Sequence, residues 1–268
     1  MRKQLWLLVM GPLCAVTAWS QTSSGTGAAS TTQAINAQNA NNVCRVYFQK
    51  PKPGSVAQFE QARVKHFQFH KSHNDTWAWE TWAIETGQDE GTYVVATCGH
   101  SWKDFDDWDK KMGKEDTADA MATMGPFLEE NFNRFYVYRA DMSLAPPPTG
   151  TPAPMESVAI YILHPGMADD FIAAVKKIND ALKKEPSWPK TAGWYQLVSG
   201  GEAPSFVIVG ERKSWADFAP LEKSVRDVLT ATYGQQTTDA TLKAMRDSTE
   251  RIITEANVYR QDLSYEPK

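Results

Sequence analysis

One segment of roughly a hundred residues occurs twice in this chain, and this repeat limits the fold more than any other feature of the sequence. Three motifs recur in the same order, at offsets of 112, 113 and 121 residues. They are Pro-Gly at 53–54 and 165–166, Ser-Trp-x-Asp-Phe at 101–105 and 214–218, and Val-Tyr-Arg-x-Asp at 137–141 and 258–262. The sequence therefore predicts two copies of one structural unit.

Two segments of biased composition set the predicted boundaries of these copies. Residues 145–154 are rich in proline, which is typical of an extended linker. Residues 21–42 are almost entirely small or polar and bury too little apolar surface to fold, so we predict a disordered tether. Unit one is then expected over 43–144 and unit two over 155–265.

The first twenty residues have the pattern of a secretory signal peptide. Arg2 and Lys3 precede an apolar stretch over 5–16, and Ala18-Trp19-Ser20 places small residues at the −3 and −1 positions of a cleavage site before Gln21. The apolar stretch is too short to span a membrane, and no later segment is longer. An exported protein, periplasmic or extracellular and without a membrane span, is predicted.

The charge of the chain argues against nucleic-acid partners. The formal net charge is −4, and no basic run is interleaved with aromatic residues. Nucleic acids and anionic membrane surfaces need such a positive surface. A small apolar or aromatic ligand is the partner that the sequence favours, and the oligomeric state is left open.

Hydrophobic periodicity gives the same order of elements in both units. Unit one is predicted to contain strands at 44–49, 77–85, 93–98 and 135–141, with a helix at 56–73 and helical segments from Ser101. Unit two is predicted to contain strands at 157–163, 193–198, 205–210 and 256–262, with a helix at 167–184 and helices from Ser214. The order β-α-β-β-α-β is the ferredoxin-like arrangement of an α+β protein.

On this order and repeat, the chain resembles the dimeric α/β-barrel superfamily. That superfamily includes antibiotic-biosynthesis monooxygenases, NIPSNAP-type proteins, chlorite dismutases and stress-responsive barrel proteins, and it pairs the sheets of two such units into a barrel. The resemblance covers nearly all of 43–265 and implies that both halves of the barrel lie in one chain. It includes no catalytic signature of a member family.

The resemblance also bears on the two cysteines that follow the signal peptide. An isolated pair in an oxidising compartment favours a disulfide. In this fold the first and third strands are antiparallel neighbours, so Cys44 at the start of one lies near Cys98 at the end of the other. A Cys44–Cys98 disulfide is therefore predicted, with a stabilisation of about 4 kcal/mol.

Three histidines of unit one share one face of a predicted helix. His66, His70 and His73 follow one another at spacings of four and three, on the side expected to face the core. At the offset of 112, Ile178 and Leu182 occupy the positions of His66 and His70 in unit two. The histidines are either buried groups satisfied by hydrogen bonds or acid/base groups and ligands that line a pocket.

Neighbouring aromatic residues extend this candidate site. Trp77 and Trp79 share one face of their predicted strand, whereas Trp82 takes the other. They either pack the core or line a pocket for a flat ligand. His100 follows the third strand and lies either on the surface or at the mouth of such a pocket.

The sequence leaves three functions open. The first is a ligand-binding protein with a pocket lined by His66, His70, His73, Trp77, Trp79 and His100. The second is an enzyme resembling the monooxygenases or the haem-handling members of the superfamily, and the third is an interaction module. No metal site is predicted, because no carboxylate or cysteine stands at ligand spacing from the histidines. The cofactor is left open, although a histidine on this helix is compatible with haem.

Overall fold

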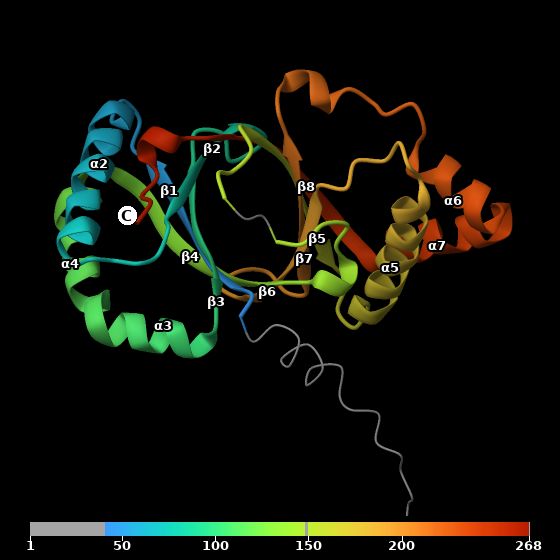
Figure 1. The fold of residues 1–268 in the computed structure, drawn as a ribbon, viewed down its shortest axis with the longest axis horizontal. Helices are drawn as coiled ribbons and strands as arrows, with labels where there is room; N and C mark the ends of the chain where they lie inside the picture. The colour runs from blue at the N-terminus through green and yellow to red at the C-terminus, as the bar shows by residue number, and fades with distance from the viewer. Residues whose placement is uncertain (1–40, 148–149, 268) are drawn as a thin grey trace, which may run out of the picture.

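The computed structural model describes residues 41–147 and 150–267 as a closed barrel of eight strands, flanked by helices on two sides (Figure 1). The predicted signal peptide (1–20) and nearly all of the predicted tether (21–42) lie outside these residues. The strand order around the barrel is β1-β3-β2-β8-β5-β7-β6-β4, and all pairs are antiparallel.

Both units contain the predicted sequence of elements. Unit one consists of β1 Val43–Pro51, α2 Val56–Ser72, β2 Glu80–Thr86, β3 Tyr93–His100, α3 Trp102–Trp108, a π-helical turn Asp109–Gly113, α4 Lys114–Thr123, a 3-10 turn Gly125–Phe127, β4 Leu128–Tyr138 and a 3-10 turn Ala140–Met142. Unit two consists of β5 Met155–Leu163, α5 Ala168–Lys184, β6 Ala192–Ser199, β7 Ser205–Arg212, a 3-10 turn Trp215–Phe218, α6 Val225–Tyr233, α7 Gln235–Ser248, β8 Thr249–Tyr259 and a 3-10 turn Gln261–Leu263.

The two half-sheets close on each other through strands of different units. Within unit one β1 pairs with β3 and β4, and β3 pairs with β2. The seams between the units are β2 with β8 and β4 with β6. Each half-sheet thus turns one face to its own helices and the other to the barrel interior, where Cys44, Tyr136, Val158, Leu197 and Val207 from five strands pack together.

Three predicted strands had wrong boundaries, each for a local reason. The strand predicted at 77–85 begins only at Glu80, because the backbone N–H of Trp77 donates to the Asp75 carboxylate instead of to a neighbouring strand. The strand predicted at 135–141 runs over Leu128–Tyr138, and the one predicted at 256–262 runs over Thr249–Tyr259. Both end early because a 3-10 turn follows, and both begin early in polar segments that lack alternating apolar residues.

The repeat extends to matching backbone and side-chain details. Gly54 and Gly166, in the turn before the first helix of each unit, have φ of +77° and +82°, a conformation that favours glycine. Arg139 binds Asp141 through two hydrogen bonds of 2.8 and 2.9 Å. The equivalent pair, Arg260 with Asp262, has distances of 2.9 and 2.7 Å. These features belong to the shared scaffold.

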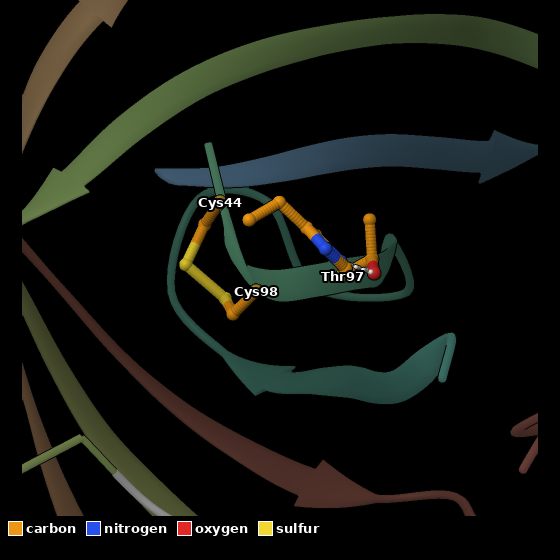
Figure 2. The surroundings of a disulfide bond; sticks show 4 residues. Cys44, Thr97 and Cys98 are labelled. Carbon is orange, nitrogen blue, oxygen red and sulfur yellow. Dashed lines mark hydrogen bonds between the residues drawn. A yellow bond between two sulfur atoms is a disulfide. The ribbon is translucent and has the colours of Figure 1, made fainter. Parts of the chain in front are cut away.

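The predicted disulfide is confirmed and lies where β1 meets β3 (Figure 2). Cys44 and Cys98 have a Cα–Cα distance of 4.1 Å and are 54 residues apart. A register shift between Val43 and Arg45 places the two cysteines opposite each other. The closed loop contains the whole of α2, β2 and most of β3. Among the described residues, no helix is long and apolar enough to cross a bilayer.

Three glutamates, Glu80, Glu156 and Glu211, lie near one another in the barrel. Glu156 is on the same face of β5 as Val158, and it pairs across the ladders with Glu211. Burial, reinforced by repulsion from Glu80 and Glu211, raises the pKa of Glu156 to about 8. Burial likewise raises the pKa of Glu80 to about 7. Both groups therefore hold a proton in the folded protein at a pH where they would lose it in the unfolded chain.

These raised pKa values predict that stability falls as the pH rises. At these two glutamates the folded state binds more protons than the unfolded state from about pH 5, just above the ordinary pKa of 4.5, to about pH 8, so their contribution to the free energy of unfolding decreases over this interval. We expect Glu156→Gln to reduce this decrease, as measured by urea unfolding at pH 5 and pH 8. Glu222→Gln, a change at an exposed glutamate, is the control and should leave the pH dependence unaltered.

Candidate metal-binding site

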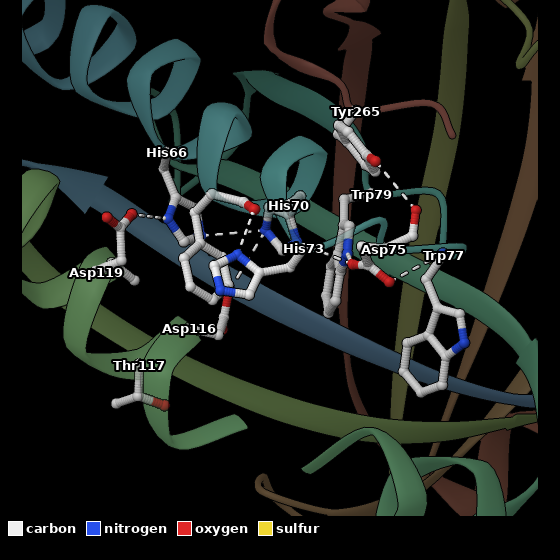
Figure 3. Close-up of polar contacts among 12 residues, drawn as sticks. His66, His70, His73, Asp75, Trp77, Trp79, Asp116, Thr117, Asp119 and Tyr265 are labelled. Carbon is white, nitrogen blue, oxygen red and sulfur yellow. Dashed lines mark hydrogen bonds and ion pairs between the residues drawn. The ribbon is translucent and has the colours of Figure 1, made fainter. Parts of the chain in front are cut away.

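Helix α2 buries Arg63, His66 and His70 on the side that faces the sheet of unit one. Figure 3 shows His66 and His70 on this side of the helix. The three residues follow at spacings of three and four, so they share one face of the helix. His66 is 5% and His70 4% exposed. Helix α4 packs beside α2 and supplies Asp116 and Asp119. The site is thus built from two helices and the loop that follows α2.

Each histidine is oriented by a carboxylate on its Nδ1 atom. The Nδ1 of His66 lies 2.6 Å from Oδ2 of Asp119, and the Nδ1 of His70 lies 2.9 Å from Oδ2 of Asp75. An ionised carboxylate only accepts hydrogen bonds, so each Nδ1 carries the proton and donates. In the neutral form of such a ring, the Nε2 atom carries a free lone pair. This carboxylate–histidine arrangement is the one that orients histidine ligands in metal sites.

The two Nε2 atoms and one carboxylate oxygen converge on a common point (Figure 3). The Nε2 atoms of His66 and His70 are 3.2 Å apart, and Oδ1 of Asp116 lies 3.3 Å and 3.5 Å from them. Tetrahedral coordination with bonds of about 2.0–2.1 Å separates neighbouring ligand atoms by about 3.3 Å. The three atoms therefore have the spacing of one face of a tetrahedral metal site.

Electrostatics makes this arrangement unfavourable without a cation. Two nitrogen lone pairs and a carboxylate oxygen face one another at close range, and Oδ1 of Asp116 is buried without a hydrogen-bond partner in the described part of the chain. A buried acceptor without a partner is costly. A proton on an Nε2 atom or a metal ion among all three atoms removes this repulsion, and a metal ion accepts a lone pair from all three atoms at once.

Asp75 connects the site to the tryptophans that the sequence singled out. Its carboxylate accepts hydrogen bonds from the indole N–H groups of Trp79, at 2.9 Å, and Trp108, at 3.3 Å. Burial opposes the ionised form of Asp75, but the hydrogen bonds from His70, Trp79 and the Trp77 backbone outweigh it and hold the pKa of this carboxyl below its usual value. Asp75 therefore remains an acceptor and fixes the orientation of His70.

A π-helical turn sets the position of Asp116 and Asp119. Residues Asp109–Gly113 form this turn between α3 and α4, and Met112 within it is buried against Trp79 and Trp108. The wider turn changes the direction in which the following residues point. Asp116 and Asp119 then share the face of α4 that lies toward α2.

The reason for predicting no metal site does not hold in the structure. The sequence offers no carboxylate at ligand spacing from His66 and His70, but Asp116 reaches them from 46 residues beyond His70 through the tertiary fold. Asp119 was missed for the same reason, whereas Asp75 and Arg63 lie near the histidines in the sequence and were not singled out. The spacing of three residues between Asp116 and Asp119 places both on one face of a helix, and it was the one sequence signal for these two residues. Because such pairs are common on exposed helices, it does not by itself indicate a metal site.

A small cavity of about 90 Å³ adjoins the converging atoms. It lies between α2, α4 and the outer face of the sheet. Its walls contain polar, aromatic and apolar residues: Tyr47, Gln49, Arg63, His66, His70, Trp79, Val95, Asp116, Thr117, Ala120, Met121, Met124 and Asn131. It holds a few atoms rather than a drug-sized molecule, for which pockets of about 300–1,000 Å³ are usual.

Of the other predicted site residues, Trp79 contributes to the cavity wall, whereas His73, Trp77 and His100 lie outside the cavity. His73 caps the end of α2, where its Nδ1 donates to the Phe69 carbonyl at 2.8 Å, and its side chain is 36% exposed. His100 stacks on Trp77 with a centroid distance of 3.7 Å, and burial lowers its pKa. Trp77 and Trp79 both pack against Trp108, at 5.5 and 5.7 Å, so the predicted aromatic platform for a flat ligand is filled by the protein itself.

Unit two has no comparable cluster among its described residues. Ile178 and Leu182, which take the places of His66 and His70, are buried against Val228 and Leu229 of α6. A larger cavity of about 1600 Å³ lies between the sheet and helices of unit two. Its walls include Tyr161, Trp194 and Trp215 but no histidine, and no pattern in the sequence indicated this cavity.

Haem, which the superfamily implies, does not fit beside the histidines of unit one. The cavity there is about 90 Å³, far below the usual size of a cofactor pocket. Both imidazoles also point their Nε2 atoms at each other and at Asp116 rather than into an open space. The donor set of two histidines and one carboxylate suits a divalent metal ion instead.

Comparisons with known proteins identify the fold and nothing more specific. No protein-family model matches the sequence, and no curated protein matches it. Similar solved structures include an anthrone oxidase-like protein, with 11% identity over 85% of this chain and 94% of that chain and a TM-score of 0.52. A proposed monooxygenase from Fusobacterium nucleatum has 10% identity over 82% of this chain and 93% of that chain, also with a TM-score of 0.52.

A chlorite dismutase from Candidatus Nitrospira defluvii, in a mutant form, is a further match. It has 11% identity over 86% of this chain and 96% of that chain, with a TM-score of 0.48. The chain thus has the dimeric α/β-barrel fold, in which two ferredoxin-like halves close one barrel of antiparallel strands.

Proposed function

We propose that this protein binds one divalent transition-metal ion in unit one, through Nε2 of His66, Nε2 of His70 and Oδ1 of Asp116. The observation that carries the proposal is the convergence of these three lone-pair atoms within 3.5 Å of one another. Asp119 and Asp75 support it, because they fix the proton on Nδ1 of each ring.

Zinc is the metal that the geometry favours. The separations of 3.2, 3.3 and 3.5 Å are those of tetrahedral coordination, whereas octahedral coordination at about 2.1 Å would bring neighbouring ligands to about 3.0 Å. Three protein ligands leave a fourth position, and the adjoining cavity gives a water molecule or a small ligand access to it. A site with such an open position binds exogenous ligands, which is the function that we propose for unit one.

This proposal retains the ligand-binding function that was the first hypothesis from the sequence. It replaces the small apolar or aromatic ligand with a small polar one. A small polar molecule suits a cavity of about 90 Å³ that contains histidine, arginine and amide side chains. Export is part of the same proposal: the disulfide supports an oxidising compartment, where proteins of this size retain such bonds.

Metal titration tests the proposal. Purified protein stripped with a chelator should bind about one equivalent of Zn²⁺ or Co²⁺ by calorimetry, and Co²⁺ should give the intense visible absorption of tetrahedral coordination. His66→Ala should lose this binding. His73→Ala and His100→Ala remove histidines outside the site and should retain it. Equal Co²⁺ binding by wild type and His66→Ala would contradict the proposal.

A further inference from the structure

Arg63 is a buried cation at the edge of the same cavity. It precedes His66 by one helical turn on α2, and it is 3% exposed. Its guanidinium donates to the Thr81 hydroxyl at 3.2 and 3.0 Å, to the Leu263 carbonyl at 3.0 Å and to the Gln49 side-chain oxygen at 3.2 Å. These contacts hold the guanidinium in one orientation between helix and sheet.

All of these partners are neutral, which is unusual for a buried arginine. Within the described ranges, Arg139 and Arg260 each bind an aspartate through two hydrogen bonds, whereas Arg63 has no carboxylate at ion-pair distance. Burial lowers the pKa of Arg63 to about 9, so the group remains charged near neutral pH. The negative charge of Asp116 acts on Arg63 only at longer range and is outweighed by burial. A buried charge without a directly bound counter-charge is unfavourable, and an anion bound to the guanidinium offsets that cost.

The guanidinium and the converging metal ligands line one cavity. Arg63, His66, His70 and Asp116 all belong to its walls, together with the amides of Gln49 and Asn131. A bound divalent ion adds positive charge to this space beside that of Arg63, so the two cations together favour a negatively charged ligand. The cavity volume of about 90 Å³ is far below the usual 300–1,000 Å³ of pockets for drug-sized ligands, so only a ligand of a few atoms suits it.

We propose that the exogenous ligand of this site is a small anion of three or four heavy atoms, bound between the metal ion and the guanidinium of Arg63. This inference rests on the proposed metal site and names its ligand class. A planar guanidinium pairs with such an anion through parallel N–H donors, and Gln49 and Thr81 keep it in place for that contact.

Azide binding to the Co²⁺-loaded protein tests the inference. Azide should shift the visible absorption of the bound Co²⁺, whereas acetonitrile, a neutral molecule of the same number of heavy atoms, should bind far more weakly. Arg63→Gln should weaken azide binding at least tenfold and change Co²⁺ affinity less than twofold. Arg226→Gln is the control, because it removes an arginine of unit two that lies outside the cavity, and it should change neither affinity.

The readouts separate this inference from the metal proposal. Failure of wild type to bind Co²⁺ overturns both. Normal Co²⁺ binding with equal azide affinity in wild type and Arg63→Gln overturns the anion site alone. Arg63 connects α2, β2 and the turn before the C-terminus, so Arg63→Gln is checked by circular dichroism. If that variant fails to fold, the affinities of wild type for azide and for acetonitrile are compared instead. Equal affinities for the two molecules overturn the inference.

Discussion

Asp116→Asn is expected to abolish the stabilisation of this protein by metal ions. Wild type in Zn²⁺ at about a thousand times the dissociation constant should gain about 4 kcal/mol, because the ion binds the folded state alone. For a folded part of this size, that gain raises the melting temperature by about 8–16 °C over chelator-treated protein. Asp116→Asn should melt at the same temperature with Zn²⁺ or with chelator, since an amide replaces the carboxylate that faces His66 and His70.

The same experiment distinguishes ligands from the residues that orient them. Asp119→Asn keeps all three metal ligands and weakens only the contact to Nδ1 of His66. Loss of such an orienting carboxylate usually costs 10–100-fold in metal affinity, so this variant should keep part of the Zn²⁺ stabilisation. Without metal, Asp116→Asn should be at least as stable as wild type, because the repulsion among the three acceptors is relieved. A Zn²⁺ stabilisation in Asp116→Asn equal to that of wild type would show that Asp116 is not a ligand.

Removal of the disulfide should produce the second large effect. Replacing both Cys44 and Cys98 with Ala frees a loop of 54 residues in the unfolded chain. The loop-entropy relation gives a loss of about 4 kcal/mol, which corresponds to a fall in melting temperature of about 8–16 °C. Thermal unfolding monitored by circular dichroism measures this fall.

A reducing agent provides the control for the double variant. Dithiothreitol should lower the melting temperature of wild type toward that of the double variant and leave the variant itself unaffected. Free-thiol titration of protein lacking residues 1–20 should find none in native wild type and two after reduction. The detection of two free thiols in protein purified without reductant would contradict the disulfide.

The fold could be derived from the sequence because its signals are local and occur twice. The turn glycines Gly54 and Gly166 and the buried Phe59 and Phe171 show the same scaffold in both copies. Ser101, where the helical segments were predicted to start, forms a capping box with Asp104 in which both hydrogen bonds are present. Strand ends were less predictable, since pairing with a distant strand decides where β4 and β8 begin.

Only part of the candidate site could be predicted from the sequence. His66 and His70 could be singled out, because unit two places Ile178 and Leu182 at those positions and packs them as an ordinary core. His73 fell on the same predicted face, but α2 ends at Ser72 and the side chain turns outward. The aromatic pocket was predicted from composition, whereas Trp77, Trp79 and Trp108 pack against one another.

The sequence by itself determined that two ferredoxin-like units occur in one chain, and that unit one departs from their common pattern at two buried histidines. These properties follow from periodicity, turn residues and the internal comparison of the two copies. Only the tertiary structure decided what the histidines face. Asp116 and Asp119 come from a separate helix, and a buried carboxylate must find a partner in space rather than along the chain. The packing of α4 against α2 therefore turns a pair of core histidines into a candidate metal site.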